Sequence, residues 1–376
     1  MWEYKQPVRI LFGEGRLREL NTEIALLGKK RGLLVTSEGF IRRGVVENIR
    51  KNCKGLVVAV FTSVSPNPDV QECDKCASLA REANCDFIIA LGGGSVLDCA
   101  KAVATLCLTA TPTADYLGTG KALPPAHIPL IAIPTTSGTG SEVSSVSVLS
   151  DHERGIKAAF SSENFYPKVA IIDPELTYSV PPYLTACTGF DVICHAIEAY
   201  WNKHHQPACD ALAVHALRLA LENIETAYHE PQNKLARRNM AESSVLAGLA
   251  FTLPKTSAPH ACSYPLTNRL GIPHGEACAL TMPHFIRYNA SHGDSRTTSL
   301  AHLVGFPDAE AMAQHFVELQ ARTNLRTSLH DFHLDDATLS LLVAESQHPN
   351  ILNNPVLVST SFLQTMYEEL HHLRAV

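Results

Sequence analysis

The sequence predicts two domains, an α/β domain with a parallel sheet followed by an all-helical domain. Short β-rich runs alternate with helical patterns in the first half, whereas β-branched runs almost vanish after about Pro181. At 376 residues, the chain is also long for one hydrophobic core. We therefore expect a first domain at residues 1–180 and a second at 181–376, with the proline-containing segment 173–182 as the hinge.

The strands of the first domain are predicted from apolar runs that end in Gly, Ser or Thr. These runs are 31–37, 55–61, 86–94 and 128–136, and helical spacing of apolar residues occurs between them at 44–52 and 69–83. This alternation predicts helices on both faces of the sheet, with ligands beyond the carboxyl ends of the strands. In the second half, 211–227 and 235–252 are long helical patterns.

Composition narrows the function. A charged fraction of 18% and a net charge of −6 give no reason to expect nucleic acid or an anionic membrane as a partner. No secretory signal is visible and no apolar run is long enough to span a bilayer, so we expect a cytoplasmic protein. Its eleven cysteines are then expected to be reduced thiols. The Cys73–Cys76 pair has CxxC spacing but no second pair nearby, which favours packing over zinc or redox chemistry.

Two loops predict a dinucleotide site. The first carries three glycines after a predicted strand and before a helix that Ser95 could cap, which suits a phosphate at the helix N-terminus. A tight strand-to-helix turn explains those glycines equally well. The second loop, 135–141, follows another strand and is rich in hydroxyls and glycines, so the two loops could contact the two ends of a dinucleotide. Neither is a Walker loop, which disfavours phosphoryl transfer.

A further group of residues predicts a metal site in the helical half. Asp191 and His195 lie four residues apart in a helical pattern, so both side chains leave one face, which also carries Glu198 as a candidate to orient a ligand. Such a pair alone is also typical of a surface or capping pair. His260 and His274, each after a proline, complete a set of one carboxylate and three imidazoles. This set suits Fe(II) or Zn(II).

Together these motifs resemble the iron-containing (metal-dependent, group III) alcohol dehydrogenases over nearly the whole chain. The matching segments are FGEGRL, LGGGSVLDCAKAVA, IPTTSGTGSEVSS, AIIDPELT, GFDVICHAIEAYW, PHACSYPLTNRLGIPHGEACALTMPHFIRYN and NNPVLVS. The resemblance implies an N-terminal Rossmann-like domain that binds NAD(P) and a helical domain that holds the metal, a fold shared with dehydroquinate synthase-like proteins. It also implies an NAD(P)H-linked alcohol dehydrogenase or aldehyde reductase that forms a homodimer.

The resemblance also assigns roles to residues. The implied metal ligands are Asp191, His195, His260 and His274. The implied dinucleotide contacts, with their loop neighbours, are Ser37, Gly92, Gly93, Gly94, Ser95, Asp98, Thr135, Thr136, Ser137 and Thr139. A divalent ion would polarise a carbonyl oxygen, so that hydride from the reduced nicotinamide attacks the carbon more easily.

Two positions depart from the family's pattern. Many members carry a histidine four residues after the third ligand, in the proposed proton path. Here that position is Tyr264, which could donate a proton or bind a substrate oxygen, or simply pack as an aromatic. Many NAD-preferring members have an aspartate after the strand that ends at Thr36, whereas this chain has Ser37 followed by Glu38. NAD(H) remains favoured over NADP(H).

The substrate is suggested by a local variant. The segment SYPLT resembles a subgroup that reduces short aldehydes with an anionic head, such as phosphonoacetaldehyde or sulfoacetaldehyde. Arg269 could contact such a head or simply face solvent, and Phe251 could line the pocket or pack in the core. Two other classes are a dehydroquinate-synthase-like lyase and a non-catalytic nucleotide-binding protein. The richer set of basic residues that such a lyase uses is not evident.

Overall fold

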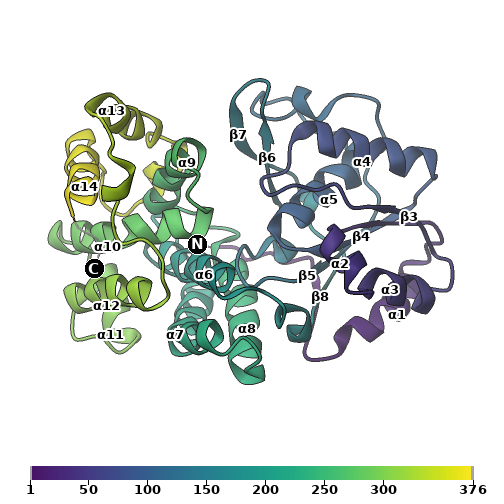
Figure 1. Ribbon diagram of the computed structural model, residues 1–376, viewed down its shortest axis with the longest axis horizontal. Coiled ribbons are helices and arrows are strands. Elements are labelled where there is room, and N and C mark those ends of the chain that lie inside the picture. Colours follow the sequence, from purple (N-terminus) through teal and green to yellow (C-terminus); the bar gives the residue numbers. More distant parts are fainter. Residues whose placement is uncertain (1, 374–376) are drawn as a thin grey trace. The chain divides into compact units, whose positions relative to one another are not determined.

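The computed structural model describes residues 2–373, which form two compact units. One unit comprises residues 5–136 and 140–177, and the other comprises 178–373 together with 2–4 and 137–139. The first unit contains the strands and the second is helical (Figure 1). The predicted fold class, an α/β domain followed by an all-helical domain, is confirmed.

A six-stranded parallel sheet forms the centre of the α/β unit, in the order β1-β8-β5-β4-β2-β3. Its strands are β1 (Arg9–Phe12), β2 (Gly32–Val35), β3 (Val57–Phe61), β4 (Phe87–Gly92), β5 (Leu130–Pro134) and β8 (Val169–Ile172). All residues of β4 and β5 are buried, which explains their continuous apolar runs. The chain moves outward from β2 to β3 and then returns to the other side of β2, so the strand order reverses between β2 and β4. Parallel sheets bind ligands beyond the strand ends at such a point.

Helices cover both faces of this sheet (Figure 1). The helices are α1 (Leu20–Leu27), α2 (Glu38–Arg42), α3 (Val45–Asn52), α4 (Val70–Glu82) and α5 (Gly94–Leu106). Successive residues of β4 point to opposite faces of the sheet. Ile88 packs with α4 and α5, whereas Ile89 packs with α1 and α3. Cys73 and Cys76 are buried in the α4–α5 cluster, and all eleven cysteines are free thiols.

Four strands of this unit were not predicted from the sequence pattern. The edge strand β1 and strand β8 are four residues each and extend the sheet at one side. An antiparallel hairpin, β6 (Val146–Asp151) and β7 (Ile156–Ser161), follows the hydroxyl-rich loop. Strands β1, β6 and β7 are only partly buried and mix polar with apolar residues, so they lack the continuous apolar runs from which the other strands were predicted.

The helical unit contains nine α-helices among the described residues. They are α6 (Pro182–Trp201), α7 (Pro207–His229), α8 (Lys234–Phe251), α9 (Ala258–Leu270), α10 (His274–Ser291), α11 (Ser295–Leu303), α12 (Ala309–Arg322), α13 (Asp336–Glu345) and α14 (Thr360–His372). One buried hydrophobic cluster joins them, and α6 lies within it because sixteen of its residues are buried. A polar side chain on α6 is therefore held in a fixed position.

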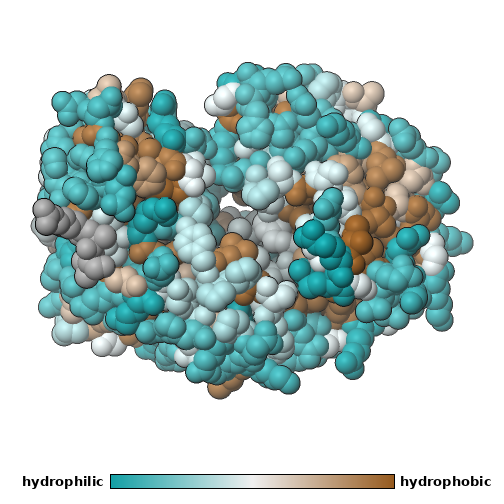
Figure 2. Space-filling view, in the orientation of Figure 1, coloured by the Kyte–Doolittle hydropathy of each residue, from teal (hydrophilic) through white to brown (hydrophobic). Residues whose placement is uncertain are grey.

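None of the helices between residues 2 and 373 is long and apolar enough to cross a membrane. On the face drawn in Figure 2, hydrophilic residues predominate and hydrophobic residues form separate groups.

Candidate metal centre and cofactor loops

Helix α6 presents three polar side chains toward the interior of the helical unit. Asp191 and His195 leave one face a turn apart, and their side chains are only 4% and 7% exposed. Glu198 follows on the same face and is fully buried. A helix surrounded by apolar neighbours does not bury three polar side chains unless they have partners.

Glu198 holds His260 in place. One carboxylate oxygen, Oε1, accepts a hydrogen bond from Nδ1 of His260, and the other, Oε2, accepts from the backbone N–H and the hydroxyl of Ser257. Trp201, also on α6, donates its indole N–H to the same hydroxyl at 2.9 Å. Because Nδ1 of His260 carries the proton, Nε2 is left with a lone pair to bind a metal. The predicted orienting role of Glu198 agrees with these contacts.

The start of α10 is fixed against α6 by a close backbone contact. A Cβ added to Gly275 would lie 2.0 Å from the carbonyl oxygen of Cys187, so only glycine fits there. The next residue, Glu276, is fully buried and accepts hydrogen bonds from the hydroxyl of Tyr183 and from the backbone and guanidinium of Arg326. These contacts set the position of His274, the first residue of α10.

The four side chains predicted as metal ligands lie together. Nε2 of His260 is 3.5 Å from Oδ1 of Asp191 and 3.0 Å from Nε2 of His195. Nε2 of His274 is 3.8 Å from the same carboxylate oxygen. Donor atoms around one ion 2.0–2.2 Å from each ligand are separated by about 3–4 Å, so this spacing suits a divalent ion.

An unpaired buried atom supports the same conclusion. Oδ1 of Asp191 has no hydrogen-bond partner among the described residues, although it is shielded from solvent. Leaving a buried carboxylate oxygen unpaired costs free energy that a bound cation would offset. The donor set and this orphaned oxygen therefore fit a divalent metal.

One residue of the centre was missed by the sequence interpretation. Single donor atoms of Asp191, His260, His274 and Cys278 all lie within 4.8 Å of one another. Cys278 is fully buried on α10, four residues after His274, and its Sγ is 4.0 Å from Nε2 of that histidine. The i,i+4 spacing of His274 and Cys278 was visible in the sequence and is the signal that could have revealed it.

The cluster shifts the pKa values of its members. Burial by itself raises the pKa of Asp191, but the neighbouring histidines outweigh burial and lower the pKa below its usual range. Burial lowers the pKa of His195 to about 4, in spite of the nearby carboxylate. Burial also opposes a charge on His260, yet Cys278, Glu198 and Asp191 raise its pKa above the usual value. A pairing of anionic and imidazole groups of this kind is typical of functional sites.

Three further candidates lie at different distances from the centre. Phe251 ends α8, and its ring stacks on His195 with centroids 4.1 Å apart. The ring of Tyr264, on α9, lies 6.3 Å from that of His274 and 4.7 Å from that of His348, and burial raises the pKa of its hydroxyl. Arg269 lies on the exposed side of the same helix.

The exposed guanidinium of Arg269 is paired with Glu345 of α13. Its Nε donates to a carboxylate oxygen at 2.7 Å, and both side chains are more than a third exposed. The contact agrees with the alternative that Arg269 faces solvent, because its guanidinium is already bound to Glu345 at the surface.

In the α/β unit, the glycine loop follows β4 and opens α5. A Cβ at Gly92 would lie 2.5 Å from Val96, so a side chain there would collide with the first turn of the helix. Gly93 is the N-cap, and its backbone approaches the second loop, because a Cβ on it would lie 3.2 Å from the hydroxyl of Thr136. No side chain caps α5, so the amides of Gly94 and its neighbours are available to an anion.

The suggestion that Ser95 caps α5 is wrong. Ser95 is the second residue of the helix, and its hydroxyl accepts a hydrogen bond from the backbone N–H of Asn67 at 3.3 Å. β4 ends at Gly92, two residues before the end of the predicted strand run 86–94, so the cap position falls on Gly93.

The remaining predicted cofactor residues differ in their surroundings. Asp98 is engaged by the protein itself, since its carboxylate accepts from the hydroxyl of Ser141 at 2.6 Å and from the backbone of Val148 at 2.9 Å. Thr135 is buried and donates its backbone N–H to Gly92, joining the two loops. Ser37 is half-buried at the N-cap of α2, beyond the end of β2. Ser137 and Thr139 belong to the helical unit, where Gly138 between them packs on Thr188.

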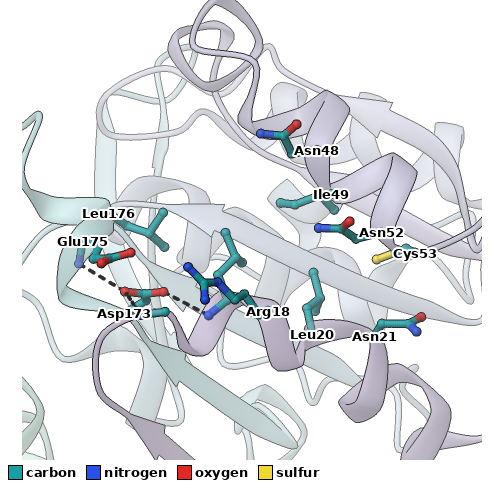
Figure 3. Close-up of a pocket in the computed structure, with 12 residues that line it drawn as sticks. Arg18, Leu20, Asn21, Asn48, Ile49, Asn52, Cys53, Asp173, Glu175 and Leu176 are labelled. Carbon is teal, nitrogen blue, oxygen red and sulfur yellow. Dashed lines mark hydrogen bonds between the residues drawn. The ribbon is translucent and has the colours of Figure 1, made fainter.

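A separate hollow of about 230 Å³ lies beside α1 and α3 (Figure 3). Its buried carboxylate, Asp173, already accepts from the backbone N–H groups of Gly15, Leu17 and Glu175. The side chains of Asn48 and Asn52 line the opposite wall. Because Asp173 is satisfied by backbone, this hollow offers no catalytic group comparable to those at the metal centre.

A parallel sheet with a glycine-rich turn at its switch point, together with an Asp–His metal centre on a helical unit, defines the class of metal-dependent, nicotinamide-linked oxidoreductases. Comparison with known proteins agrees. The iron-containing alcohol dehydrogenase family matches residues 7–174, and the C-terminal region of the Fe-containing alcohol dehydrogenase family matches residues 185–370. The chain belongs to the iron-containing alcohol dehydrogenase family.

Individual relatives are similar along nearly the whole chain. The crystal structure of sulfoacetaldehyde reductase from Bifidobacterium kashiwanohense in complex with NAD+ has a TM-score of 0.97 and 49% identity, with 100% of both chains covered. Long-chain-alcohol dehydrogenase 1 of Geobacillus thermodenitrificans is 35% identical over 95% of this chain and 93% of its own. The 4-hydroxybutyrate dehydrogenase of Cupriavidus necator is 35% identical, with 91% of each chain covered. The predicted reaction class, alcohol dehydrogenase or aldehyde reductase, is thereby confirmed, and the lyase and the non-catalytic alternatives are not supported.

Proposed function

We propose that this protein reduces a short aldehyde with an anionic head, with sulfoacetaldehyde as the first candidate, at the expense of NADH. The observation that carries the proposal is the cluster of Asp191, His195, His260 and His274, with the unpaired carboxylate oxygen of Asp191 inside it. The similarity to sulfoacetaldehyde reductase supports the choice of aldehyde.

In this proposal the predicted domain at 1–180 binds the dinucleotide. The free amides at the start of α5 attract the pyrophosphate, and the contact between Gly93 and Thr136 brings the second loop beside it. The complete proposed set is Ser37, Gly92, Gly93, Gly94, Ser95, Asp98, Thr135, Thr136, Ser137 and Thr139. Asp98 acts through its bond to Ser141, which ties the hydroxyl-rich loop to α5.

Preference for NAD(H) is assigned to the end of β2. Glu38 is exposed at the first position of α2, directly after Ser37. A carboxylate there would bind ribose hydroxyls and repel a 2′-phosphate. Glu38→Gln should therefore raise kcat/KM for NADPH relative to NADH. An unchanged ratio would separate Glu38 from cofactor choice.

The predicted domain at 181–376 holds one divalent ion, Fe(II) or Zn(II), which when bound polarises the carbonyl of the aldehyde. The chain's own groups then orient the substrate and supply the proton. Tyr264 lies on the same helix as His260 and beside His274, and its hydroxyl Oη is the proposed proton donor to the nascent alcohol. Phe251 supports His195 and forms an apolar wall.

The anionic head is assigned to His348. Nδ1 of this histidine accepts a hydrogen bond from the backbone N–H of Asn350 at 3.2 Å, which leaves Nε2 as the N–H donor. The ring lies 4.7 Å from that of Tyr264, so one substrate molecule could contact both side chains. Arg269 is the second candidate, but it would have to leave Glu345 to act.

A kinetic panel tests this proposal. The zinc- or iron-loaded protein is given NADH with sulfoacetaldehyde, phosphonoacetaldehyde, propionaldehyde and butyraldehyde. We expect the sulfonate or phosphonate compound to have a kcat/KM at least about tenfold higher, or about 1.4 kcal/mol in transition-state binding. Equal efficiency for the uncharged aldehydes would overturn the anionic head. His348→Ala should raise KM for the sulfonate but not for the uncharged aldehydes. If instead only Arg269→Ala raised KM for the sulfonate, Arg269 would be the residue that binds the anionic head.

The proposal also includes a homodimer located in the cytoplasm. Size-exclusion chromatography with light scattering would report the first, and fractionation of cells that express the protein would report the second.

A further inference from the structure

Lys101 is a fully buried lysine in the α/β unit. It lies on α5, the helix whose start carries the glycine loop, and its side chain is shielded from solvent. A lysine is rarely buried completely without partners, because its ammonium loses hydration. A side chain in this position acts on protein groups around it, so its partners show what the buried charge does.

The ammonium of Lys101 binds the segment that follows the hydroxyl-rich loop. Nζ donates to the hydroxyl of Ser144 at 3.0 Å and to the carbonyl oxygen of Val146 at 2.8 Å. Ser144 is itself buried, and Val146 is the first residue of β6. Loss of the ammonium would therefore deprive a buried hydroxyl and a backbone carbonyl of their shared donor.

Asp98, three residues earlier on the same face of α5, binds the same segment. Its carboxylate accepts from the hydroxyl of Ser141 at 2.6 Å and from the backbone N–H of Val148 at 2.9 Å. Burial lowers the pKa of Lys101 to about 8, and the nearby carboxylates of Asp98 and Glu142 act in the opposite direction. Two oppositely charged side chains of α5 thus hold residues 141–148 against the helix.

These bonds fix the end of the hydroxyl-rich loop, and its start is fixed as well. The backbone N–H of Thr135 donates to the carbonyl of Gly92 at 3.0 Å. The loop is therefore tied at both ends to the strand and helix that carry the glycine turn. A loop that is already held loses less conformational freedom when a ligand binds, so the ligand binds more tightly.

We propose that Lys101 is a positioning residue for the dinucleotide, because it holds the hydroxyl-rich loop beside the start of α5 without touching the cofactor. This inference rests on the dinucleotide site of the proposed function and adds a residue to it. Without the ammonium, the segment 141–148 loosens and the loop has to be ordered as NADH binds. Affinity for NADH then falls, whereas the metal centre, whose proposed ligands belong to the helical unit, is unaffected.

The test measures NADH binding to the full-length, zinc-loaded protein by the change in nicotinamide fluorescence. Lys101→Met keeps the apolar stem but removes the ammonium, and we expect Kd for NADH to rise at least about tenfold, or about 1.4 kcal/mol. Ser144→Ala removes one of the two acceptors and should raise Kd about threefold. The control Lys75→Met, at an exposed position of α4, should bind NADH as the wild type does. Zn(II) affinity should be the same in all four proteins.

Steady-state kinetics separates positioning from a purely structural role. With the best aldehyde of the kinetic panel, we expect Lys101→Met to raise KM for NADH and to leave kcat at saturating NADH unchanged. A lower kcat with unchanged Kd and KM would mean that Lys101 only stabilises the fold, because a smaller folded fraction lowers kcat alone.

The binding data also separate this inference from the proposed function. Equal Kd values in wild type, Lys101→Met and Ser144→Ala would overturn the role of Lys101 while leaving the dinucleotide site intact. Absence of NADH binding by the wild type would overturn the dinucleotide site and the proposed function with it. If circular dichroism shows that Lys101→Met does not fold, Ser144→Ala decides the question, and an unchanged Kd in that variant overturns the inference.

Discussion

The imidazole of His195 stacks on the phenyl ring of Phe251, with centroids 4.1 Å apart and planes inclined by 12°. The ring of His195 also lies 4.6 Å from that of His260. Phe251 therefore restricts the orientation of a proposed ligand without offering a donor atom. This contact links the end of α8 to the metal centre.

The stacking predicts the effect of Phe251→Leu. The leucine keeps an apolar side chain but removes the flat surface, so His195 gains rotational freedom. We expect Zn(II) affinity, measured by competition with a chelator, to fall about tenfold. Phe306→Leu is the control and should leave Zn(II) affinity unchanged. The ring of Phe306 also lies against a histidine, His315, with centroids 5.1 Å apart, but that histidine is not a proposed ligand. Equal affinities in wild type and Phe251→Leu would show that the stacking does not hold the ligand.

A second prediction concerns the carboxylate that orients His260. Glu198→Gln keeps the shape of the side chain but replaces the charged carboxylate, whose oxygens accept hydrogen bonds from Nδ1 of His260 and from Ser257, with a neutral amide. We expect metal affinity to fall by about 10–100-fold, the range found when a group that hydrogen-bonds to a metal ligand is removed. Metal content after dialysis against a chelator measures this. The control Glu222→Gln, at an exposed position of α7, should retain metal as the wild type does. If Glu198→Gln also retained metal, Glu198 would not orient His260 for metal binding.

The close contact at the start of α10 gives a prediction about stability. In Gly275→Ala the new methyl would lie 2.0 Å from the Cys187 carbonyl oxygen and 3.0 Å from Cβ of Asp191, so backbone must move. We expect the free energy of unfolding in urea to fall by about 3 kcal/mol. Gly39→Ala is the control, because its methyl would meet the flexible side chain of Arg43 as its nearest neighbour at 3.2 Å. A stability change smaller than that of the control would mean that the contact relaxes freely.

The turnover prediction concerns Tyr264. Tyr264→Phe removes the hydroxyl from a ring whose centroid lies 6.3 Å from that of His274, and it keeps the ring that packs against His348. We expect kcat for aldehyde reduction to fall by about 10²-fold, the lower end for loss of an acid–base group, with metal content unchanged. Steady-state kinetics together with metal analysis separates the two effects. Wild-type kinetics in this variant would exclude Tyr264 from the proton path.

Stability should also depend on pH through Glu142, which directly follows the hydroxyl-rich loop 135–141. Burial raises the pKa of its carboxyl from 4.5 to about 7 in the folded protein. The folded state therefore favours the protonated form, and the stability that this provides is complete below pH 4.5 and is lost as the pH rises through about 7. The buried Lys101, whose own pKa burial lowers to about 8, is the nearby cation that acts on Glu142, and its ammonium donates to the hydroxyl of Ser144 and the carbonyl of Val146.

The measurement is urea unfolding of wild type and Glu142→Gln from pH 5 to pH 8. The wild type should lose up to about 3 kcal/mol relative to the variant over this range. The exposed Glu82→Gln should give a curve parallel to that of the wild type. Parallel curves for Glu142→Gln would contradict the assigned burial effect.

Local sequence patterns predicted two kinds of feature: strands that are continuous apolar runs, and side chains that share one face of a single helix. The strands β2 to β5 follow from apolar runs, and the shared face of Asp191, His195 and Glu198 follows from helical spacing. Convergence of His260 and His274 with that face came from the family resemblance, because the residues lie on three different helices.

Other features depend on tertiary contacts that no local pattern contains. The fit of Gly275 against Cys187 and the approach of Phe251 to His195 exist only once the helices pack. Pairing of Arg269 with Glu345 likewise joins two helices far apart in sequence. Cys278 is different, since its spacing from His274 was readable, but one cysteine among eleven carried little weight on its own.

The central claim is that one divalent ion at this cluster is required for aldehyde reduction. The most direct measurement titrates metal-stripped protein with Zn(II) or Fe(II) and follows oxidation of NADH by sulfoacetaldehyde. We predict no turnover without metal and a linear rise to a plateau at about one equivalent per chain. Full turnover by the stripped protein, unaffected by added metal, would contradict the account.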